Sequence, residues 1–488
     1  MAGWLSPVMI ALSAALLGRA HYVVYILKRR TRATVVVTWT STAVVVGFWL
    51  LDSGCGKPSL QCVVKMSEEL TARCDATKET LLEIVRQHGT PTYAFDVERL
   101  RVQANRLRSE LPDAIEIYYS LKANASLGIC DVLAESGLGA DVASAGELAT
   151  AVEAGFAASR LFVAGPCKSP ETWAMLRELP EAIISIDSPG ELSLFADQNL
   201  PNPVVLRLRP DYESCAIVRA GAGSRFGVPQ NELPRCREIF DGGRINLIGF
   251  HVFAGSQVLE ASGVIDHLRR GLELSLQAAN VLKITPEFLN LGGGFGIPYE
   301  ADQAELDLAP VSLELESIID RAGGARVVLE LGRYLVAQAG WYLTSVLTHQ
   351  THGCRPAVVV DGGTHQRADM CGMNLRQTAA SPLALFTTEA AKRPTDVLGC
   401  LSLPADVMTE SGELPSLSVG DVLAYANAGA YGMWASPAIF HSTPLPAEVA
   451  FDGSSISVMR TRKPACSVLD DQFHVASKIS VTTGQRVG

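Results

Sequence analysis

Residues 115–137, IEIYYSLKANASLGICDVLAESG, determine how the rest of the chain is interpreted. The β-rich run IEIYYSL is followed, after a short polar break, by a stretch with the apolar spacing of a helix. This order predicts a strand, a loop and a helix. The same alternation recurs along the chain from residue 96 onwards.

Eight β-rich runs alternate with helical stretches in this region. They are IEIYYSL (115–121), ADVA (140–143), RLFVAG (160–165), IISID (183–187), VVLRLR (204–209), NLIGFHVF (246–253), EFLNLGG (287–293) and RVVLELG (326–332). One helical stretch begins with Ser144 and Glu147, which form a capping box. Eight repeats over roughly 220 residues favour an α/β fold of the (β/α)8 TIM-barrel type over an open sheet.

After residue 335 the pattern changes to strands joined by turns. The predicted strands are WYLTSVLTHQ, PAVVVDGG, DVLGCLSL, DVLAYANAG, AEVAFDG and SISVMRTR, and PTYAFD (91–96) can add a strand from before the barrel. We therefore expect a C-terminal all-β domain. The predicted divisions are a leader (1–65), an N-terminal helix and strand (66–95), the barrel (96–335), the β-domain (336–475) and a tail (476–488).

The charge is distributed unevenly over the 488 residues. The whole chain carries a net charge of −10, but residues 1–65 hold seven basic and one acidic side chain, so the remaining body is strongly acidic. An acidic body argues against general nucleic-acid binding. Eleven scattered cysteines do not resemble a disulfide framework and favour a reducing compartment, so we expect a cytoplasmic catalytic body.

The N-terminal leader has two interpretations. Residues 33–51 carry no charge, which is just long enough for a membrane-spanning helix. The basic residues at 28–32 would then be cytoplasmic, and the acidic body would be outside. Either the leader is a membrane anchor, or translation begins at Met66; the sequence leaves both open.

The most informative residue at a predicted strand end is Lys122, directly after IEIYYSL. Active groups of TIM barrels lie at the C-terminal ends of the strands. Desolvation there would lower the pKa of the lysine and make its amine available for Schiff-base chemistry. The alternative is a lysine that merely caps the end of a strand.

Two further features complete a chemical pattern. Gly292, Gly293 and Gly294 follow the seventh run, near the usual phosphate corner of a barrel. Glu330 lies in the apolar eighth run, where its carboxylate needs either a protonated ring nitrogen or a barrel arginine as partner. A lysine, an anion site and an acid together describe a pocket for pyridoxal 5'-phosphate (PLP).

The segment HQTHGC contains three residues of metal-ligating type, His349, His352 and Cys354. It lacks a fourth ligand at a suitable spacing, so we interpret it as an ordinary loop and predict no metal site.

Several motifs in order resemble the fold-type III PLP enzymes, which include the diaminopimelate, ornithine and arginine decarboxylases. The motifs, between about residues 85 and 465, are YYSLKAN, GLGADVASAGEL, GFHVFAGSQ, NLGGGFG, ELGRYL, VVVDGG and NAGAYG. The resemblance implies an alanine-racemase-like barrel, PLP, and a homodimer with shared active sites. The phrases ADVASAGELA, NLGGGFGIPY and GRYLVAQA resemble the branch that contains the glutamyl-carrier-protein decarboxylase of butirosin-type biosynthesis.

The resemblance also implies a role for each matching residue. Lys122 would carry the cofactor as an aldimine, and Glu330 would pair with the pyridine nitrogen. The remaining cofactor-binding residues would be Asp141, Arg207, Phe253, Ser256, Gly292, Gly293, Gly294, Gly332, Arg333 and Tyr431. The residues facing the substrate would be Arg333, Asp361 and Tyr431.

Two departures from the family pattern bear on function. Phe253 stands where many members stack a histidine on the cofactor ring, and an aromatic face can still stack. The family's loop GPLCESGD reads GCLSLPAD here, so its catalytic cysteine becomes Ser402, with Cys400 two residues before it. Leu403 replaces the acid that grips a distal ammonium, which favours an acylated, carboxylated or carrier-bound amino acid over a free diamino acid.

Three functions are compatible with these residues. The first is a PLP-dependent amino-acid decarboxylase. The second is an amino-acid racemase, although racemases commonly place arginine, and not an acid such as Glu330, against the ring nitrogen. The third is a catalytically silent regulatory homologue, suggested by Ser402, although the complete cofactor pocket argues against it.

Overall fold

The computed structural model describes residues 77–216, 218–219, 223–240, 245–300, 303–367, 382–385, 391–453 and 455–473, together with strands at 23–27, 33–40 and 43–50. The chain divides into two compact units, residues 1–81 and residues 82–488.

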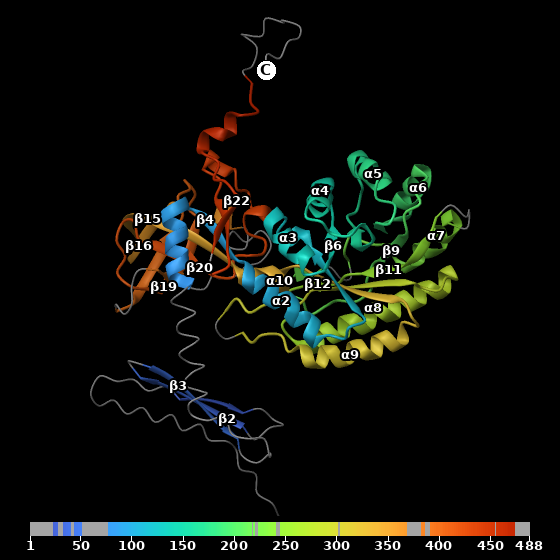
Figure 1. Cartoon of the computed structure of the whole chain (residues 1–488), viewed down its shortest axis with the longest axis horizontal. Coiled ribbons are helices and arrows are strands. Elements are labelled where there is room, and N and C mark those ends of the chain that lie inside the picture. Colours follow the sequence, from blue (N-terminus) through green and yellow to red (C-terminus); the bar gives the residue numbers. More distant parts are fainter. Residues whose placement is uncertain are drawn as a thin grey trace, which may run out of the picture. The chain divides into compact units, whose positions relative to one another are not determined.

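The larger unit contains a closed barrel of eight parallel strands (Figure 1). Its strands are β5 (Ile115–Ser120), β6 (Gly139–Val142), β7 (Leu161–Val163), β8 (Ile183–Ile186), β9 (Val204–Leu208), β11 (Leu247–Val252), β13 (Phe288–Gly293) and β14 (Arg326–Leu331). Seven of them lie within the runs expected from the sequence, and β6 begins one residue before the run ADVA. The pairing of β14 with β5 closes the ring, so the prediction of a (β/α)8 barrel is confirmed.

Helices connect the barrel strands and flank them on the outside (Figure 1). They are α2 (Val97–Glu110), α3 (Leu127–Glu135), α4 (Ala145–Glu153), α5 (Pro170–Arg177), α6 (Pro189–Gln198), α7 (Leu233–Phe240), α8 (Ala261–Leu282) and α9 (Leu308–Arg321), with the short α10 (Arg333–Val336) after the last strand. The expected cap of α4 is present: Glu147 N donates to Ser144 Oγ at 3.2 Å. The carboxylate of Glu147 in turn accepts from Ala143 N at 2.7 Å.

The inside of the barrel is filled by one apolar layer. It consists of Tyr118, Phe162, Ile183, Val205, Phe288 and Val328, all buried. Alternate residues of a strand point to the same side, so the inward-facing residues two positions further on form the next layer toward the C-terminal ends. That next layer is polar, and it forms the floor of the site described below.

The segment after the barrel is built around a nine-stranded sheet, as expected. Its strands are β4 (Thr92–Asp96), β15 (Gly340–His352), β16 (Arg355–Val360), β18 (Arg393–Leu398), β19 (Val407–Leu414), β20 (Val422–Tyr425), β21 (Ala447–Phe451), β22 (Ile456–Arg460) and the short β17 (Leu383–Ala384). The early strand β4 pairs with both β15 and β21, which confirms that PTYAFD joins this sheet.

Two details of this sheet differ from the sequence-based expectation. Strand β19 was not expected, because VMTESGEL is mostly polar. The run DVLGCLSL was expected to be one strand, but β18 ends at Leu398 and GCLSL belongs to a turn. Asp406 fixes that turn: its carboxylate accepts from Leu401 N at 2.9 Å and from Thr364 N at 2.7 Å.

In the smaller unit, β1 (Val23–Leu27), β2 (Ala33–Thr40) and β3 (Ala43–Leu50) form an antiparallel three-stranded sheet. Residues 33–51, the candidate for a spanning helix, thus contain two of these strands. Among the residues that the structure describes, no helix is both long enough and apolar enough to cross a membrane. The basic cluster at 28–32 lies outside the described residues.

Candidate active site

A polar layer lies directly above the apolar filling of the barrel. Its members stand two positions after an inward-facing residue of the same strand: Ser120, Ser185, Arg207, His251, Asn290 and Glu330. Because the strands are parallel, these side chains gather toward the end of the barrel where active sites form.

Lys122 lies at the mouth of the barrel, in a 3-10 turn (Leu121–Ala123) that follows β5. Its Nζ is 3.7 Å from Asp141 Oδ2 and 5.2 Å from the centre of the Phe253 ring. The side chain is 44% exposed. The amine is therefore accessible from solvent and is held between a carboxylate and an aromatic face.

The prediction that the pKa of Lys122 is lowered is wrong. Burial lowers the pKa of this amine, but the nearby carboxylates of Asp141 and Glu330 outweigh burial and raise it above its ordinary value. The lysine whose pKa burial does lower is Lys168, which is only 1% exposed and is paired with Glu191 at 3.0 Å. Accessibility, and not a depressed pKa, distinguishes Lys122 as the reactive candidate.

Glu330 is held as an anion on the floor of the site. Asn290 Nδ2 donates a hydrogen bond to Glu330 Oε1 at 2.6 Å, and His251 Nε2 lies 3.5 Å from the same oxygen. Burial would raise the pKa of Glu330, but His251, Lys122 and Arg207 together lower it. A buried, ionised carboxylate is suited to pairing with a protonated ring nitrogen.

His251 belongs to the motif GFHVFAGSQ, but the sequence predicted no role for it. Its Nδ1 is 3.0 Å from Ser185 Oγ, and its ring packs edge-on against Phe162 with centroids 5.2 Å apart. Burial lowers the pKa of His251, and the neighbouring Glu330 opposes this shift. Its buried Nε2 has no hydrogen-bond partner in the described part of the chain and faces Glu330.

The glycine run forms a cradle with little space for side chains. Gly292 and Gly294 have φ angles of 65° and 77°, in the left-handed region that favours glycine. A Cβ at Gly292 would lie 2.8 Å from Val252 O, and one at Gly294 would collide with Gly255 O. Asn290 Oδ1 accepts from Gly292 N at 2.9 Å, so a single side chain joins the cradle to Glu330.

Arg333 and Tyr431 lie on the far side of the same cavity. The guanidinium of Arg333 is 4.7 Å from the centre of the Tyr431 ring, and its Nη1 donates to Tyr299 Oη at 2.7 Å. Arg333 is buried, and its Nε has no hydrogen-bond partner among the described residues. Tyr431 N donates to Ala123 O at 2.7 Å, which ties this loop to the turn that carries Lys122.

The structure brings most of the expected cofactor residues to one cavity. It is lined by Ser120, Lys122, Phe253, Ser256, Gly294, Phe295, Glu330, Leu331, Gly332, Arg333 and Tyr431. Gly292 and Gly293 are continuous with Gly294, and Asp141 contacts Lys122. Arg207 does not line this cavity: its Nη1 pairs with Asp187 Oδ1 at 3.3 Å and its guanidinium lies over Phe226.

Three expected residues lie in the β-sheet region and do not line this cavity. The Asp361 carboxylate accepts hydrogen bonds from Thr344 Oγ1 at 2.6 Å and Ser345 N at 2.9 Å. Cys400 N donates to Gly362 O at 2.8 Å, so the turn with Cys400 and Ser402 runs beside Asp361. Burial and Asp406 raise the pKa of the Cys400 thiol to about 11.

The HQTHGC segment lies at the end of β15, remote in the chain from the barrel strands. His352 Nδ1 is 2.7 Å from Asp396 Oδ2, and Arg355 Nη2 donates to the same oxygen at 2.9 Å. These contacts give His352 an ion-pair environment. Within the described residues no group of three or more metal-ligating side chains occurs.

The residues around this cavity fit PLP. The glycine cradle leaves no room for side chains, and the buried Arg333 has an N–H without a partner among the described residues. Glu330 is an ionised carboxylate on the floor of the cavity, and Lys122 supplies an accessible amine. These are the groups needed for a phosphate, a protonated ring nitrogen and an aldehyde carbon.

Comparison with known proteins agrees with this chemistry. Residues 97–337 match the pyridoxal-binding domain of the pyridoxal-dependent decarboxylases. The L-glutamyl-[BtrI acyl-carrier protein] decarboxylase of Niallia circulans is 29% identical over 413 residues, covering 81% of this chain and 96% of that protein. The diaminopimelate decarboxylase of Deinococcus radiodurans is 30% identical over 400 residues, covering 79% of this chain and 97% of that protein.

Solved structures share the fold. A diaminopimelate decarboxylase from Helicobacter pylori, crystallised with L-lysine, has a TM-score of 0.72 and 24% identity, covering 80% of this chain and 98% of that one. The arginine decarboxylase of Paramecium bursaria Chlorella virus has a TM-score of 0.66 and 19% identity, with 77% and 100% covered. The chain therefore belongs to the fold-type III family of PLP-dependent decarboxylases.

Proposed function

We propose that this chain removes the α-carboxylate of an amino acid or amino-acyl derivative as CO2, with PLP held at Lys122. One observation carries the proposal: an ionised Glu330 forms the floor of the same cavity that Lys122 enters. Bound PLP supplies an electron sink for the carbanion left at Cα, and a carboxylate under the ring nitrogen strengthens that sink.

The residues that the family pattern singles out, in and around the cavity, each have a proposed task. Lys122 would hold the cofactor through its aldehyde, and the exposure of this side chain would give a substrate amine access to it. Phe253 would cover the cofactor ring. Ser256, the run Gly292–Gly294, Gly332 and Arg333 would hold the phosphate, with Tyr431 beside them, while Asp141 and Arg207 set the charge around Lys122.

We propose that the substrate carries no free distal ammonium. Leu403 is exposed at the position where the family pattern has an acid, so no carboxylate there can bind such a group. The relative from Niallia circulans acts, by its name, on a glutamyl group attached to a carrier protein. A carrier-bound, acylated or carboxylated amino acid is the substrate class that we favour.

We further propose a homodimer in which each site is completed by the neighbouring subunit. Asp361, Cys400 and Ser402 lie outside the cavity of their own chain but are grouped on one turn region of the sheet. Exposed apolar side chains, Ile439 at 71% and Phe473 at 90% among them, provide surface that a partner could cover. Arg333, Asp361 and Tyr431 would then surround the substrate.

The proton that replaces CO2 comes, in this proposal, from Cys400 or from Ser402. The raised pKa of Cys400 keeps its thiol protonated at neutral pH, so it holds a proton to give. Ser402 is exposed and is a much weaker acid. Single Cys400→Ser and Ser402→Ala variants distinguish the two, since only loss of the donor slows proton return to Cα.

Release of CO2 by the full chain reconstituted with PLP tests the proposed reaction. The substrates are free diaminopimelate, ornithine, arginine and glutamate, and glutamate linked to a carrier protein. Release from the carrier-linked substrate is expected. Release from free diamino acids alone would show that our interpretation of Leu403 is wrong, and exchange of the α-proton without CO2 would indicate a racemase.

A gain-of-function variant tests whether Leu403 excludes substrates with a free distal ammonium. Leu403→Asp restores an acid and should increase turnover of free diamino acids. Val419→Asp, which adds the same charge at an exposed position elsewhere in the sheet region, should not. A protein that binds no PLP and releases no CO2 from any substrate would instead be a silent homologue.

We also propose that the body of the protein works in a reducing compartment, the cytoplasm. Seven cysteines in the described part of the chain are free, and Cys215 and Cys354 among them are exposed to solvent. In an oxidising environment, exposed thiols of this kind would form disulfides. The division into a barrel at 96–335 and a β-domain at 336–475 is proposed from the change of sequence pattern after residue 335. Fractionation of cells that express the full chain, followed by N-terminal sequencing, tests the location and the Met66 start together.

A further inference from the structure

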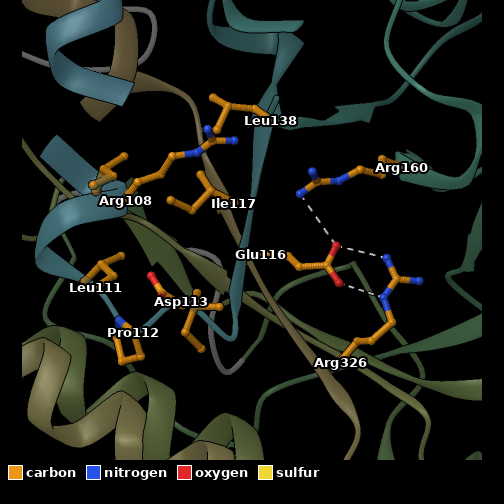
Figure 2. A pocket seen from close by; sticks show the side chains of 11 residues that line it. Arg108, Leu111, Pro112, Asp113, Glu116, Ile117, Leu138, Arg160 and Arg326 are labelled. Carbon is orange, nitrogen blue, oxygen red and sulfur yellow. Dashed lines mark hydrogen bonds and ion pairs between the residues drawn. The ribbon is translucent and has the colours of Figure 1, made fainter. Parts of the chain in front are cut away.

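A cavity of about 520 Å³ lies at the opposite end of the barrel from Lys122. It is lined by Leu107, Arg108, Leu111, Pro112, Asp113, Ile115, Glu116, Ile117, Leu138, Arg160 and Arg326 (Figure 2). These residues come from the C-terminal part of α2 and from the N-terminal ends of β5, β14 and the segments that enter β6 and β7. The proposed reaction uses none of them.

One carboxylate in this cavity is already neutralised. Arg326 Nε and Nη2 donate to the two oxygens of Glu116 at 2.7 and 2.9 Å, and Arg160 Nη2 lies 3.6 Å from Oε2 (Figure 2). Burial raises the pKa of Glu116, but Arg326 and Arg160 lower it overall, so Glu116 stays ionised. The two guanidinium groups of Arg326 and Arg160 are therefore paired with a single carboxylate, so these three side chains carry a net charge of +1.

A third guanidinium, that of Arg108, and a second acid, Asp113, also line the cavity, so the charged side chains of its lining carry a net charge of +1. Within the described residues Arg108 makes no hydrogen bond or ion pair. Arg108 and Arg160 meet at Gly137: Arg160 Nη1 donates to Gly137 O at 2.7 Å, and a Cβ at Gly137 would lie 2.8 Å from Arg108 Nη2. Figure 2 shows the two side chains entering the cavity from opposite sides.

Arg160 also has one N–H donor without a hydrogen-bond partner in the described part of the chain. This donor is its buried Nε. An unmet buried N–H costs free energy, and an oxyanion that binds the Arg160 guanidinium would reduce that cost. Guanidinium groups bind carboxylates and phosphates through paired, planar hydrogen bonds.

The remaining walls restrict the ligand further. They are aliphatic, from Leu107, Leu111, Ile115, Ile117 and Leu138, and the volume lies in the range of small-molecule sites. We propose that this cavity is a second ligand site, which binds a small carboxylate with an aliphatic body, its carboxylate seated beside Gly137 between Arg108 and Arg160.

Binding of hexanoate to the PLP-loaded full chain, measured by calorimetry, tests this proposal. One saturable site per chain is expected. Arg108→Gln should weaken hexanoate binding about tenfold or more, because it removes a charge-assisted hydrogen bond. The matched control is Arg101→Gln on the same helix, whose ion pair with Glu135 is outside the cavity and whose loss should leave binding unchanged.

Two comparator ligands separate charge from shape. Hexanamide keeps the aliphatic body without the charge, and inorganic phosphate keeps the charge without the body; both should bind more weakly than hexanoate. The proposal is overturned if hexanoate does not saturate, if hexanamide or phosphate binds equally well, or if neither Arg108→Gln nor Arg160→Gln changes its affinity. A circular-dichroism melt confirms that each variant is folded.

Discussion

The side-chain amide of Asn290 donates a hydrogen bond to Glu330 Oε1 across 2.6 Å on the floor of the PLP site. The same side chain accepts from Gly292 N, so the carboxylate under the ring and the glycine cradle share one support. Asn290 thereby holds Glu330 and the glycine cradle in fixed positions relative to one another, although Asn290 itself does not line the cavity.

Replacing Asn290 with Ala should weaken PLP binding. A hydrogen bond to a charged group contributes about 1.5–3 kcal/mol, so the dissociation constant of PLP should rise about 10- to 100-fold. Absorbance titration of the apoprotein with PLP measures it. Asn202 provides a matched control: it is equally buried and donates to Leu179 O and Ala182 O, away from the site.

Asn202→Ala should lower the melting temperature and leave the PLP dissociation constant unchanged. If Asn290→Ala binds PLP as the native protein does, or if Asn202→Ala weakens binding equally, then Asn290 does not position the site.

Replacing Glu330 with Gln should separate cofactor binding from catalysis. The amide keeps the shape and can still accept from Asn290, but it has no charge to keep a ring nitrogen protonated. We expect PLP to bind while kcat for CO2 release falls about 10- to 100-fold, the loss of one charge-assisted interaction. Unchanged kcat in Glu330→Gln would contradict the role that we assign to this carboxylate.

Acid should destabilise the barrel through His267 on α8. Its Nε2 is 2.9 Å from Leu291 O and its Nδ1 is 3.0 Å from Tyr212 Oη, and burial lowers its pKa from about 6.5 to about 4. Between about pH 4 and pH 6.5, the unfolded chain therefore binds a proton at His267 that the folded chain does not bind. Stability is full above pH 6.5 and falls as the pH drops toward 4, by up to about 3 kcal/mol.

Urea denaturation at pH 7 and at pH 4.5 measures this loss. His267→Gln should be less stable at pH 7 but should lose less stability between the two pH values. His441→Gln, at an exposed position, should keep the native pH dependence. An identical acid loss in His267→Gln would rule out His267 as the group responsible.

Cys400 should be a slow nucleophile despite its place beside the site turn. Its raised pKa of about 11 leaves only about 0.1% thiolate at pH 8. Iodoacetamide at pH 8 should therefore modify exposed Cys354 well before Cys400, as peptide mass mapping can show. Cys400 should react faster as the pH rises toward 11; preferential alkylation of Cys400 at pH 8 would contradict its protonated state.

The barrel was predictable because its strands are short β-rich runs separated by helices with clear caps. The all-β sheet was less so, because its strands depend on pairing partners distant in sequence. VMTESGEL forms β19 through its pairing with β18, and the apolar run at 399–403 turns because the Asp406 carboxylate binds its backbone. Neither contact has a signal in the local sequence.

The site was predictable where a residue stands at a strand end, as Lys122 and Glu330 do. His251 lies in the motif GFHVFAGSQ but was given no role, and Asn290 was not assigned to the site, although it follows the inward-facing Phe288 by two residues. The pKa of Lys122 was predicted in the wrong direction because Asp141 comes close only through the pairing of β5 with β6.

The central claim is that Lys122 is the residue that holds PLP, and trapping the linkage tests it most directly. The PLP-loaded full chain is reduced with borohydride, digested and mapped by mass spectrometry. One pyridoxyl group per chain is expected, on the peptide containing Lys122, and none in Lys122→Ala. A pyridoxyl group on Lys168, the buried lysine with the lowered pKa, or no modification of the Lys122 peptide, would contradict it.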